Sequence, residues 1–144
     1  MALSPDIPWV TFNFLALTPE QSALGKARAV VLPVPYDSTT SYRTGSRYGP
    51  MAILQASSGL EDYDHELDLD VSSLGIHTTP FLEPHMAGPA QMVERIQKAV
   101  HEYASTGKIV GVLGVDVKAD TEFKITSRIL RTFLNTRKGS RCRT

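Results

Sequence analysis

Polar side chains gather in one stretch of the sequence, residues 36–49, where they could bind a small polar molecule. Gly45 and Gly49 allow the backbone bends that would bring these groups together over a neighbouring element. The stretch lacks both the Gly-Lys-Ser/Thr ending of a phosphate loop and dinucleotide spacing, which argues against a nucleotide site. From the residues alone, a binding loop and an ordinary structured connection both stay open. The polar residues are Tyr36, Asp37, Thr39, Thr40, Ser41, Tyr42 and Arg43.

Other residues that could bind a metal or act as a nucleophile lack the spacing for it. Carboxylates alternate along residues 62–70, but Leu67 and Ser73 stand where a calcium loop requires glycine and glutamate, so a solvated strand face is favoured. No two of the four histidines are spaced to aim imidazole rings at one metal ion. Cys142, the single cysteine, has no disulfide partner within the chain and no context of a nucleophile.

The apolar pattern of the first half predicts a strand, a loop and a helix. Residues 28–33 are apolar, rich in β-branched side chains and ended by prolines, which predicts a buried strand. Residues 36–49 have no hydrophobic period and should form a loop at the strand's carboxyl end, where ligands gather in open α/β sheets. Pro50 suits the first turn of a helix. The predicted apolar face of that helix consists of Ala52, Ile53, Ala56 and Leu60.

The second half predicts a further helix and three extended segments. Residues 61–71 alternate polar and apolar side chains, which predicts one half-exposed strand, and residues 76–81 predict another short extended piece. A helix should begin at Pro89 and stop before Gly107, and residues 108–113 predict a second buried strand. This order indicates an α/β fold with a parallel sheet and flanking helices. The apolar face of the helix consists of Met92, Val93, Ile96, Ala99, Val100 and Tyr103.

Length and composition are those of one globular folding unit. The 144 residues are 42% hydrophobic and 21% charged, and no apolar run approaches the length of a membrane span. No Lys or Arg precedes Lys26, so the basic region of a signal peptide is missing and a cytoplasmic location is expected.

The charge is distributed unevenly, although its sum is zero. Residues 1–120 hold eight Lys and Arg against fourteen Asp and Glu, whereas residues 121–144 hold seven against one. Such a basic tail can bind nucleic acid or a membrane surface, or it can be a chain end translated from a shifted reading frame. One helix is predicted within residues 119–135. The tail has no recognisable nucleic-acid-binding module, which argues against that role.

Several segments together resemble agmatinase-type members of the arginase, or ureohydrolase, family. Their order and spacing carry the resemblance, which covers about 60% of the chain, mainly residues 28–113. The segments are Val30-Val-Leu-Pro-Val-Pro-Tyr-Asp37, Thr40-Ser-Tyr-Arg-Thr-Gly45, Arg47-Tyr-Gly-Pro50, Leu60-Glu-Asp-Tyr-Asp64, Glu66-Leu-Asp68, Gly75-Ile-His-Thr78 and Val110-Gly-Val-Leu-Gly114.

The resemblance implies the N-terminal part of an arginase-like α/β/α fold, with a site at the carboxyl ends of the strands. In the family, two manganese ions there activate a hydroxide, which attacks a guanidinium carbon and releases urea. The resemblance also implies polyamine biosynthesis and a symmetric homo-oligomer. Val117 stands where the first metal-binding motif of the family has histidine, and the two later metal-binding motifs have no counterpart. An isopropyl group cannot coordinate a cation, so we expect no catalytic and no metal-binding residue in this chain.

The sequence therefore predicts a truncated or frame-shifted agmatinase-like ureohydrolase that is inactive by itself. Residues 1–118 would form an incomplete ureohydrolase-like α/β domain, and residues 119–144 a divergent basic tail. The alternatives are a non-catalytic protein that pairs with a related subunit through an open sheet edge, and a weak nucleic-acid binder that uses the tail. The residues expected to form the wall of the substrate site are Tyr36, Asp37, Thr44, Gly45 and Gly49.

Overall fold

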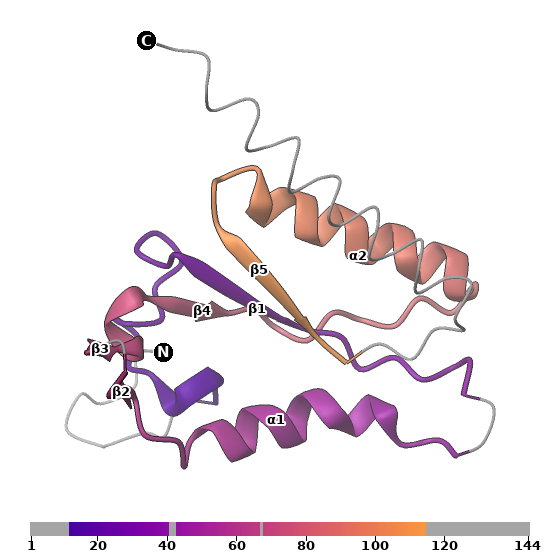
Figure 1. The fold of residues 1–144 in the computed structure, drawn as a ribbon. Helices are drawn as coiled ribbons and strands as arrows, with labels where there is room; N and C mark the ends of the chain where they lie inside the picture. Colours follow the sequence, from indigo (N-terminus) through magenta and orange to yellow (C-terminus); the bar gives the residue numbers. More distant parts are fainter. Residues whose placement is uncertain (1–11, 41–42, 67, 115–144) are drawn as a thin grey trace, which may run out of the picture.

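A parallel sheet lies at the centre of the computed structural model (Figure 1). β1 (Ala29–Pro33) is the middle strand, with β4 (Ile76–Thr78) along one edge and β5 (Ile109–Leu113) along the other. The parallel sheet predicted from the sequence is therefore confirmed. The structure describes residues 12–40, 43–66 and 68–114, so the predicted helix in residues 119–135 and the basic tail lie outside the described residues.

Helices cover the sheet from both sides, which gives the three layers of an α/β/α arrangement. α2 (Pro89–Ala104) lies on one face of the sheet, and α1 (Gly49–Ser57) lies on the other (Figure 1). α1 belongs to the connection from β1 to β4, and α2 connects β4 to β5. The α/β fold with flanking helices is confirmed. None of the helices in the described ranges is long and apolar enough to cross a membrane.

α2 forms the main core with the sheet, as its apolar spacing predicts. Pro89 occupies the first turn, where its missing N–H costs nothing, and Gly107 follows the last turn with a φ of 82°. Both predicted boundaries are confirmed. The core between α2 and the sheet consists of Leu32, Val34, Tyr36, Met92, Val93, Ile96 and Val100, with Leu82, Ala99, Val110 and Val112 packed against it.

α1 begins as predicted from Pro50, but the predicted buried face is wrong. Leu54 and Ser57 are buried, whereas Ile53 is 43% exposed. The Ser57 hydroxyl explains this orientation, since it accepts a hydrogen bond from Leu15 N at 2.9 Å and donates one to Leu54 O at 2.7 Å. The contact fixes α1 against the 3₁₀ turn η1 (Phe14–Ala16). The side of the helix that carries Pro50, Leu54 and Ser57 is thereby turned inward.

Residues 61–71 form a hairpin and not the single strand that their alternation predicts. β2 (Tyr63–Asp64) pairs antiparallel with β3 (Leu69–Asp70), and the turn between them places Asp68 at a φ of 50°. The Asp70 carboxylate accepts a hydrogen bond from Ser72 N at 2.9 Å and begins the 3₁₀ turn η3 (Val71–Leu74). Local turn chemistry of Asp residues therefore ends the extended backbone.

β5 lies where the second strand was predicted, but it is not buried. Its first residue, Ile109, is 62% exposed, and no strand of the described residues lies beyond its outer edge. Val110 and Val112 pack toward α2, so the exposed positions belong to the opposite face. The apolar run 108–113 predicts the strand correctly, but burial of both faces requires neighbours that the described residues do not supply.

Candidate functional site

The loop that carries the predicted site residues continues directly from the carboxyl end of β1. Val34 N donates a hydrogen bond to Leu113 O at 2.8 Å, so the backbone follows β5 for one residue beyond the strand. Tyr36 and Asp37 come next and are only 1% and 3% exposed. The loop therefore begins inside the protein, at the sheet edge where parallel α/β folds bind ligands.

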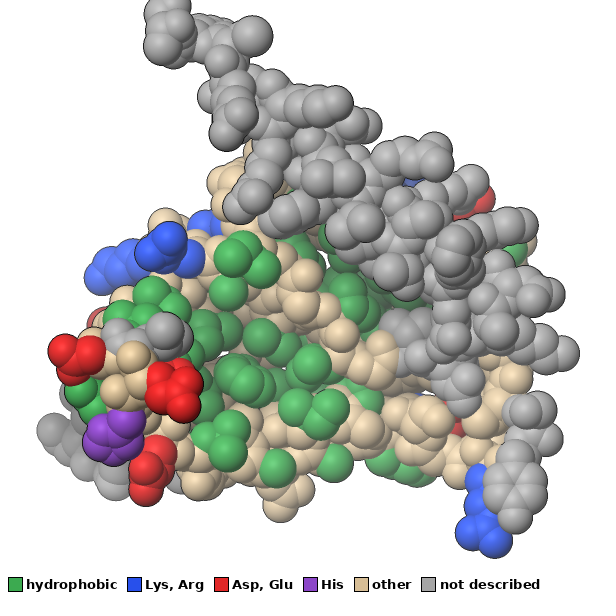
Figure 2. Space-filling view, in the orientation of Figure 1, with side chains coloured by type: hydrophobic (Ala, Val, Ile, Leu, Met, Phe, Trp, Pro, Cys, Tyr) green, Lys and Arg blue, Asp and Glu red, His purple; other side chains and the backbone are tan. Residues whose placement is uncertain are grey.

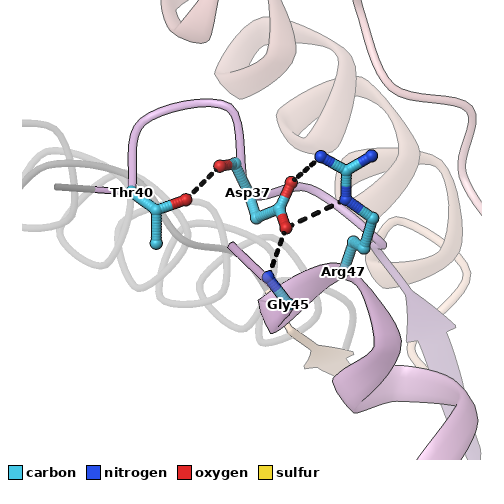
Figure 3. Close-up of polar contacts among 4 residues, drawn as sticks. All are labelled: Asp37, Thr40, Gly45 and Arg47. Atoms are coloured by element: carbon cyan, nitrogen blue, oxygen red, sulfur yellow. Dashed lines mark hydrogen bonds and ion pairs between the residues drawn. The ribbon is translucent and has the colours of Figure 1, made fainter. Parts of the chain in front are cut away.

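The Asp37 carboxylate holds the loop together (Figure 3). Its Oδ2 accepts hydrogen bonds from Gly45 N and from Arg47 Nε, both at 2.9 Å, and Arg47 Nη2 lies 2.7 Å from Oδ1. The Thr40 hydroxyl donates a hydrogen bond to the Asp37 carbonyl oxygen. The contact with Arg47 is bidentate, which is the strong and geometrically specific form of an arginine–carboxylate pair. We call Asp37, Thr40, Gly45 and Arg47 the loop clamp.

The loop clamp keeps Asp37 ionised. Hydrogen bonds from the Arg47 side chain and the Gly45 backbone lower the pKa of Asp37 below its usual 3.8, and the carboxylate in turn raises the pKa of Arg47. A carboxylate with a lowered pKa is a poor proton acceptor at neutral pH. The arrangement can therefore shape a wall of a site, but it does not supply a general base.

Glycine is required at Gly45 and not at Gly49. Gly45 has a φ of 139°, which side chains rarely permit, and this turn directs its N–H toward the Asp37 carboxylate. Gly49 has an ordinary helical φ of −54°, and its N–H bonds to Ser46 O in the 3₁₀ turn η2 (Ser46–Tyr48). The structure thus gives the two predicted glycines different roles.

The remaining predicted wall residues lie in different surroundings. Thr44 is exposed beside the loop clamp, whereas Tyr36 belongs to the core beneath α2. The Tyr36 hydroxyl is buried and has no hydrogen-bond partner among the described residues. The structure therefore brings Asp37 and Gly45 into contact, while Tyr36 lies in the core and Thr44 lies at the surface.

Arg47 is the loop-clamp residue that sequence reasoning missed. It belongs to the family-like segment Arg47-Tyr-Gly-Pro50, but its partner lies ten positions earlier across an irregular loop. The available signal was chemical: a carboxylate that follows a buried strand is expected to need a cation, because an unpaired buried charge is costly.

Gly114 brings the end of β5 against the start of α1. A Cβ atom on Gly114 would lie 2.7 Å from Pro50 Cγ and 2.8 Å from Val34 O, so only glycine allows this approach. The carboxyl ends of β1 and β5 and the first turn of α1 consequently meet at one place, next to the loop clamp.

The described residues do not fit a manganese centre. They contain no group of three or more His, Cys, Asp or Glu that could hold a metal ion. Asp37, the carboxylate at the strand ends, is engaged by Arg47, and His77 Nδ1 donates to Ser22 O at 2.8 Å. Val117 lies outside the described residues. We therefore derive no chemical step through a metal.

These features define a parallel α/β protein with a clamped loop at the carboxyl ends of its strands, and comparison with known proteins identifies its family. Residues 27–118 match the Arginase family, and the chain belongs to that family. The chain is 39% identical over 111 residues to an N(1)-aminopropylagmatine ureohydrolase of Synechocystis, a match that covers 73% of this chain and 34% of the relative. It is 34% identical over 95 residues to the agmatinase of Bacillus subtilis, covering 66% and 32% respectively.

Solved structures show the same fold. The agmatine ureohydrolase of Thermoplasma volcanium matches with a TM-score of 0.62 at 24% identity, over 72% of this chain and 34% of that protein. A hypothetical agmatinase from Burkholderia thailandensis matches with a TM-score of 0.63 at 21% identity, over 85% and 37%. The chain thus spans about a third of the length of the relatives that it matches. The arginase-like fold predicted from the sequence is confirmed for this portion.

Proposed function

We propose that these 144 residues form an incomplete agmatinase-type ureohydrolase scaffold that does not hydrolyse guanidino compounds by itself. The reaction of complete relatives would be the manganese-dependent hydrolysis of agmatine, or a similar guanidino compound, to an amine and urea. One observation carries the proposal: Val117 stands at the position of the first metal-binding histidine, within Gly114-Val-Asp-Val-Lys118. A dinuclear metal site cannot form without donor side chains.

The loop clamp supports a role in shaping the site. In this proposal, Asp37, Thr44, Gly45 and Gly49 border the place where a guanidino substrate would sit, and Tyr36 supports them from the core. The clamp fixes the loop before any substrate arrives, because Asp37 already has its donors. Residues 1–118 would be the scaffold, and residues 119–144 a separate basic tail.

The relatives suggest which substrates to test. Their names point to agmatine and to N(1)-aminopropylagmatine, which share a guanidinium group and differ in the attached amine. A place in polyamine biosynthesis, a cytoplasmic location and assembly into homo-oligomers are extended to this chain from its family, whereas manganese dependence is extended to complete relatives only. Each of them belongs to the proposal.

Manganese titration calorimetry combined with a urea-release assay tests the proposed function. The full chain is mixed with manganese and either substrate, and the Bacillus subtilis agmatinase serves as the positive control. We expect no stoichiometric manganese binding and no urea release by this chain. Tight stoichiometric binding together with turnover would refute the proposal.

A further inference from the structure

Asp37 is the one buried carboxylate in the described part of the chain. Its side chain is 2% exposed, whereas every other Asp and Glu that the structure describes is half-buried or exposed. An exposed carboxylate is surrounded by water, which screens its charge and makes surface ion pairs weak. The charge of a buried carboxylate is screened much less. Asp37 is therefore the carboxylate with the strongest attraction for a cation among the described residues.

The cation at Asp37 is a guanidinium, and the contact has the geometry of guanidinium recognition. Arg47 Nε lies 2.9 Å from Oδ2 and Arg47 Nη2 lies 2.7 Å from Oδ1, so one edge of the flat guanidinium meets both carboxylate oxygens. Gly45 N donates to Oδ2 at 2.9 Å from another side and fixes the orientation of the carboxylate (Figure 3). An ammonium group has no pair of parallel donors in a fixed plane. The geometry therefore favours a guanidinium over an amine.

Arg47 reaches the buried carboxylate from the protein surface. The Arg47 side chain is 51% exposed, although the Asp37 side chain that it contacts is 2% exposed. The other contacts of Asp37 come from the Gly45 backbone and from the Thr40 hydroxyl, which donates to the Asp37 carbonyl oxygen. These contacts do not involve the Arg47 side chain. Removal of that side chain should therefore open the carboxylate to solvent while its other contacts remain.

The acidic surface of the protein lies away from this loop. Figure 2 shows acidic side chains gathered over the hairpin of β2 and β3, at the opposite end of the molecule from the loop in Figure 1. Residues 61–70 hold six Asp and Glu and no Lys or Arg. Such a surface attracts any cation through charge alone. Binding at Asp37 must therefore be distinguished from loose attraction to the hairpin.

We propose that the Asp37 carboxylate is a guanidinium-binding site, which the chain's own Arg47 occupies and thereby closes to free guanidino compounds. Arg47 is ten positions from Asp37 in the sequence, so its guanidinium is present at a high effective concentration. A dissolved guanidino compound competes poorly with it. Without the Arg47 side chain, the site binds such a compound. The inference goes beyond the proposed function, because this binding requires neither a metal ion nor the cleavage of a bond.

The occupied site also determines what this wall offers to a substrate. With Arg47 in place, the surface at Asp37 presents a half-exposed cation and not a carboxylate. A positively charged guanidino substrate is not attracted to such a surface. Asp37 therefore shapes the loop, and Arg47 prevents it from binding the substrate.

Thermal unfolding of the full chain carrying Arg47→Ala, in the presence of agmatine, tests the site. Agmatine has a guanidinium and an ammonium group on a four-carbon chain, and 1,4-diaminobutane, with two ammonium groups on the same chain, is the probe of equal charge. We expect agmatine to bind with a dissociation constant on the order of 1–10 mM. At about ten times that concentration it should raise the unfolding temperature by about 5 °C. 1,4-Diaminobutane should bind at least about tenfold more weakly.

Two control proteins assign the binding to Asp37. The unchanged chain should show no shift with either probe, because Arg47 occupies the site. The double variant Asp37→Asn, Arg47→Ala should show none either, because a neutral amide lacks the charge that pairs with a guanidinium. If Arg47→Ala is unfolded by itself, near-UV circular dichroism should show that agmatine restores the folded signal and that 1,4-diaminobutane does not. A metal chelator is present throughout, so that binding at a metal centre does not contribute.

Three results would overturn the proposal. The first is a lack of agmatine binding by Arg47→Ala, in either measurement. The second is an equal response to the two probes, which would indicate loose attraction to the acidic hairpin. The third is an equal agmatine response of the unchanged chain, which would show that Arg47 does not close the site. Urea release by the unchanged chain would refute the proposed function and leave the guanidinium site standing, so the two proposals fail on different results.

Discussion

On the α2 face of the sheet, Met92 and Ile96 are fully buried against β1 and β5, whereas on the opposite face Ile109 is 62% exposed and Val31 is half-buried. Both faces are built from apolar residues of the same strands. An apolar pattern therefore indicates which positions can be buried. The neighbouring elements of the fold determine which of these positions are buried. The α2 face is completed by neighbours within the described residues, and the opposite face is not.

Ile96→Ala should have the largest effect of the changes that test this difference. Removing the side chain from the closed core should lower the free energy of unfolding by about 2–5 kcal/mol, because it leaves a cavity beneath α2. Urea denaturation followed by circular dichroism measures the loss. The matched control is Ile109→Ala, which should cost about 0.5 kcal/mol or less. Equal losses at the two isoleucines would mean that both faces are closed.

Gly114→Ala should have the next largest effect, because Gly114 packs at the end of β5 directly against Val34 and the first turn of α1. The left-handed backbone, with a φ of 76°, costs alanine about 1–2 kcal/mol, and the contact with Pro50 and Val34 adds about 1–3 kcal/mol. Gly107→Ala is the control, since its φ is 82° and no atom lies within 4 Å of the added Cβ. Denaturation midpoints compare the two. Similar losses for both variants would remove the argument for close packing at Gly114.

Asp37→Asn should have the smallest effect of the three changes, and the stability that it loses relative to the unchanged chain should be largest at neutral pH and shrink in acid. Because the folded-state pKa of Asp37 is lowered, its contribution to stability is present above the unfolded value, near 3.8, and is lost as pH falls through the lower folded value. Thermal unfolding across this range should show a smaller acid-dependent loss for Asp37→Asn than for the unchanged chain. Glu83→Gln, at a carboxylate whose side chain is 89% exposed, should keep the original pH profile. An unchanged profile for Asp37→Asn would contradict the role of the loop clamp.

Sequence reasoning located the elements that depend on local pattern. The strand at residues 29–33 and the helix from Pro89 were predictable, because β-branched runs, helical spacing and end signals lie within each segment. The orientation of α1 was not predictable, since it depends on a hydrogen bond from Leu15, 42 positions before Ser57. The hairpin at residues 61–71 was missed because an Asx-type turn, in which Glu66 N donates to Asp64 Oδ1, overrode the alternation.

The candidate site was predictable in place and only partly in detail. The position of Asp37 after a buried strand identified the loop, because the carboxyl ends of parallel strands are where such loops carry function. Its pairing with Arg47 depends on the turn at Gly45, whose φ of 139° no side-chain pattern encodes. The inward position of Tyr36 likewise depends on α2, which is supplied more than fifty residues later.

The pairing of β1 also has a consequence for how the chain acquires its structure. Ala29 meets Ile76 on one side and Ile109 on the other, so the middle strand cannot gain both partners until residue 113 has been synthesised. Such distant pairings make folding slow, because the entropy cost of closing long loops comes before the stabilising contacts form. During translation, the apolar segment around Val30 and Leu32 stays available to chaperones and to other nascent chains until those partners have been synthesised.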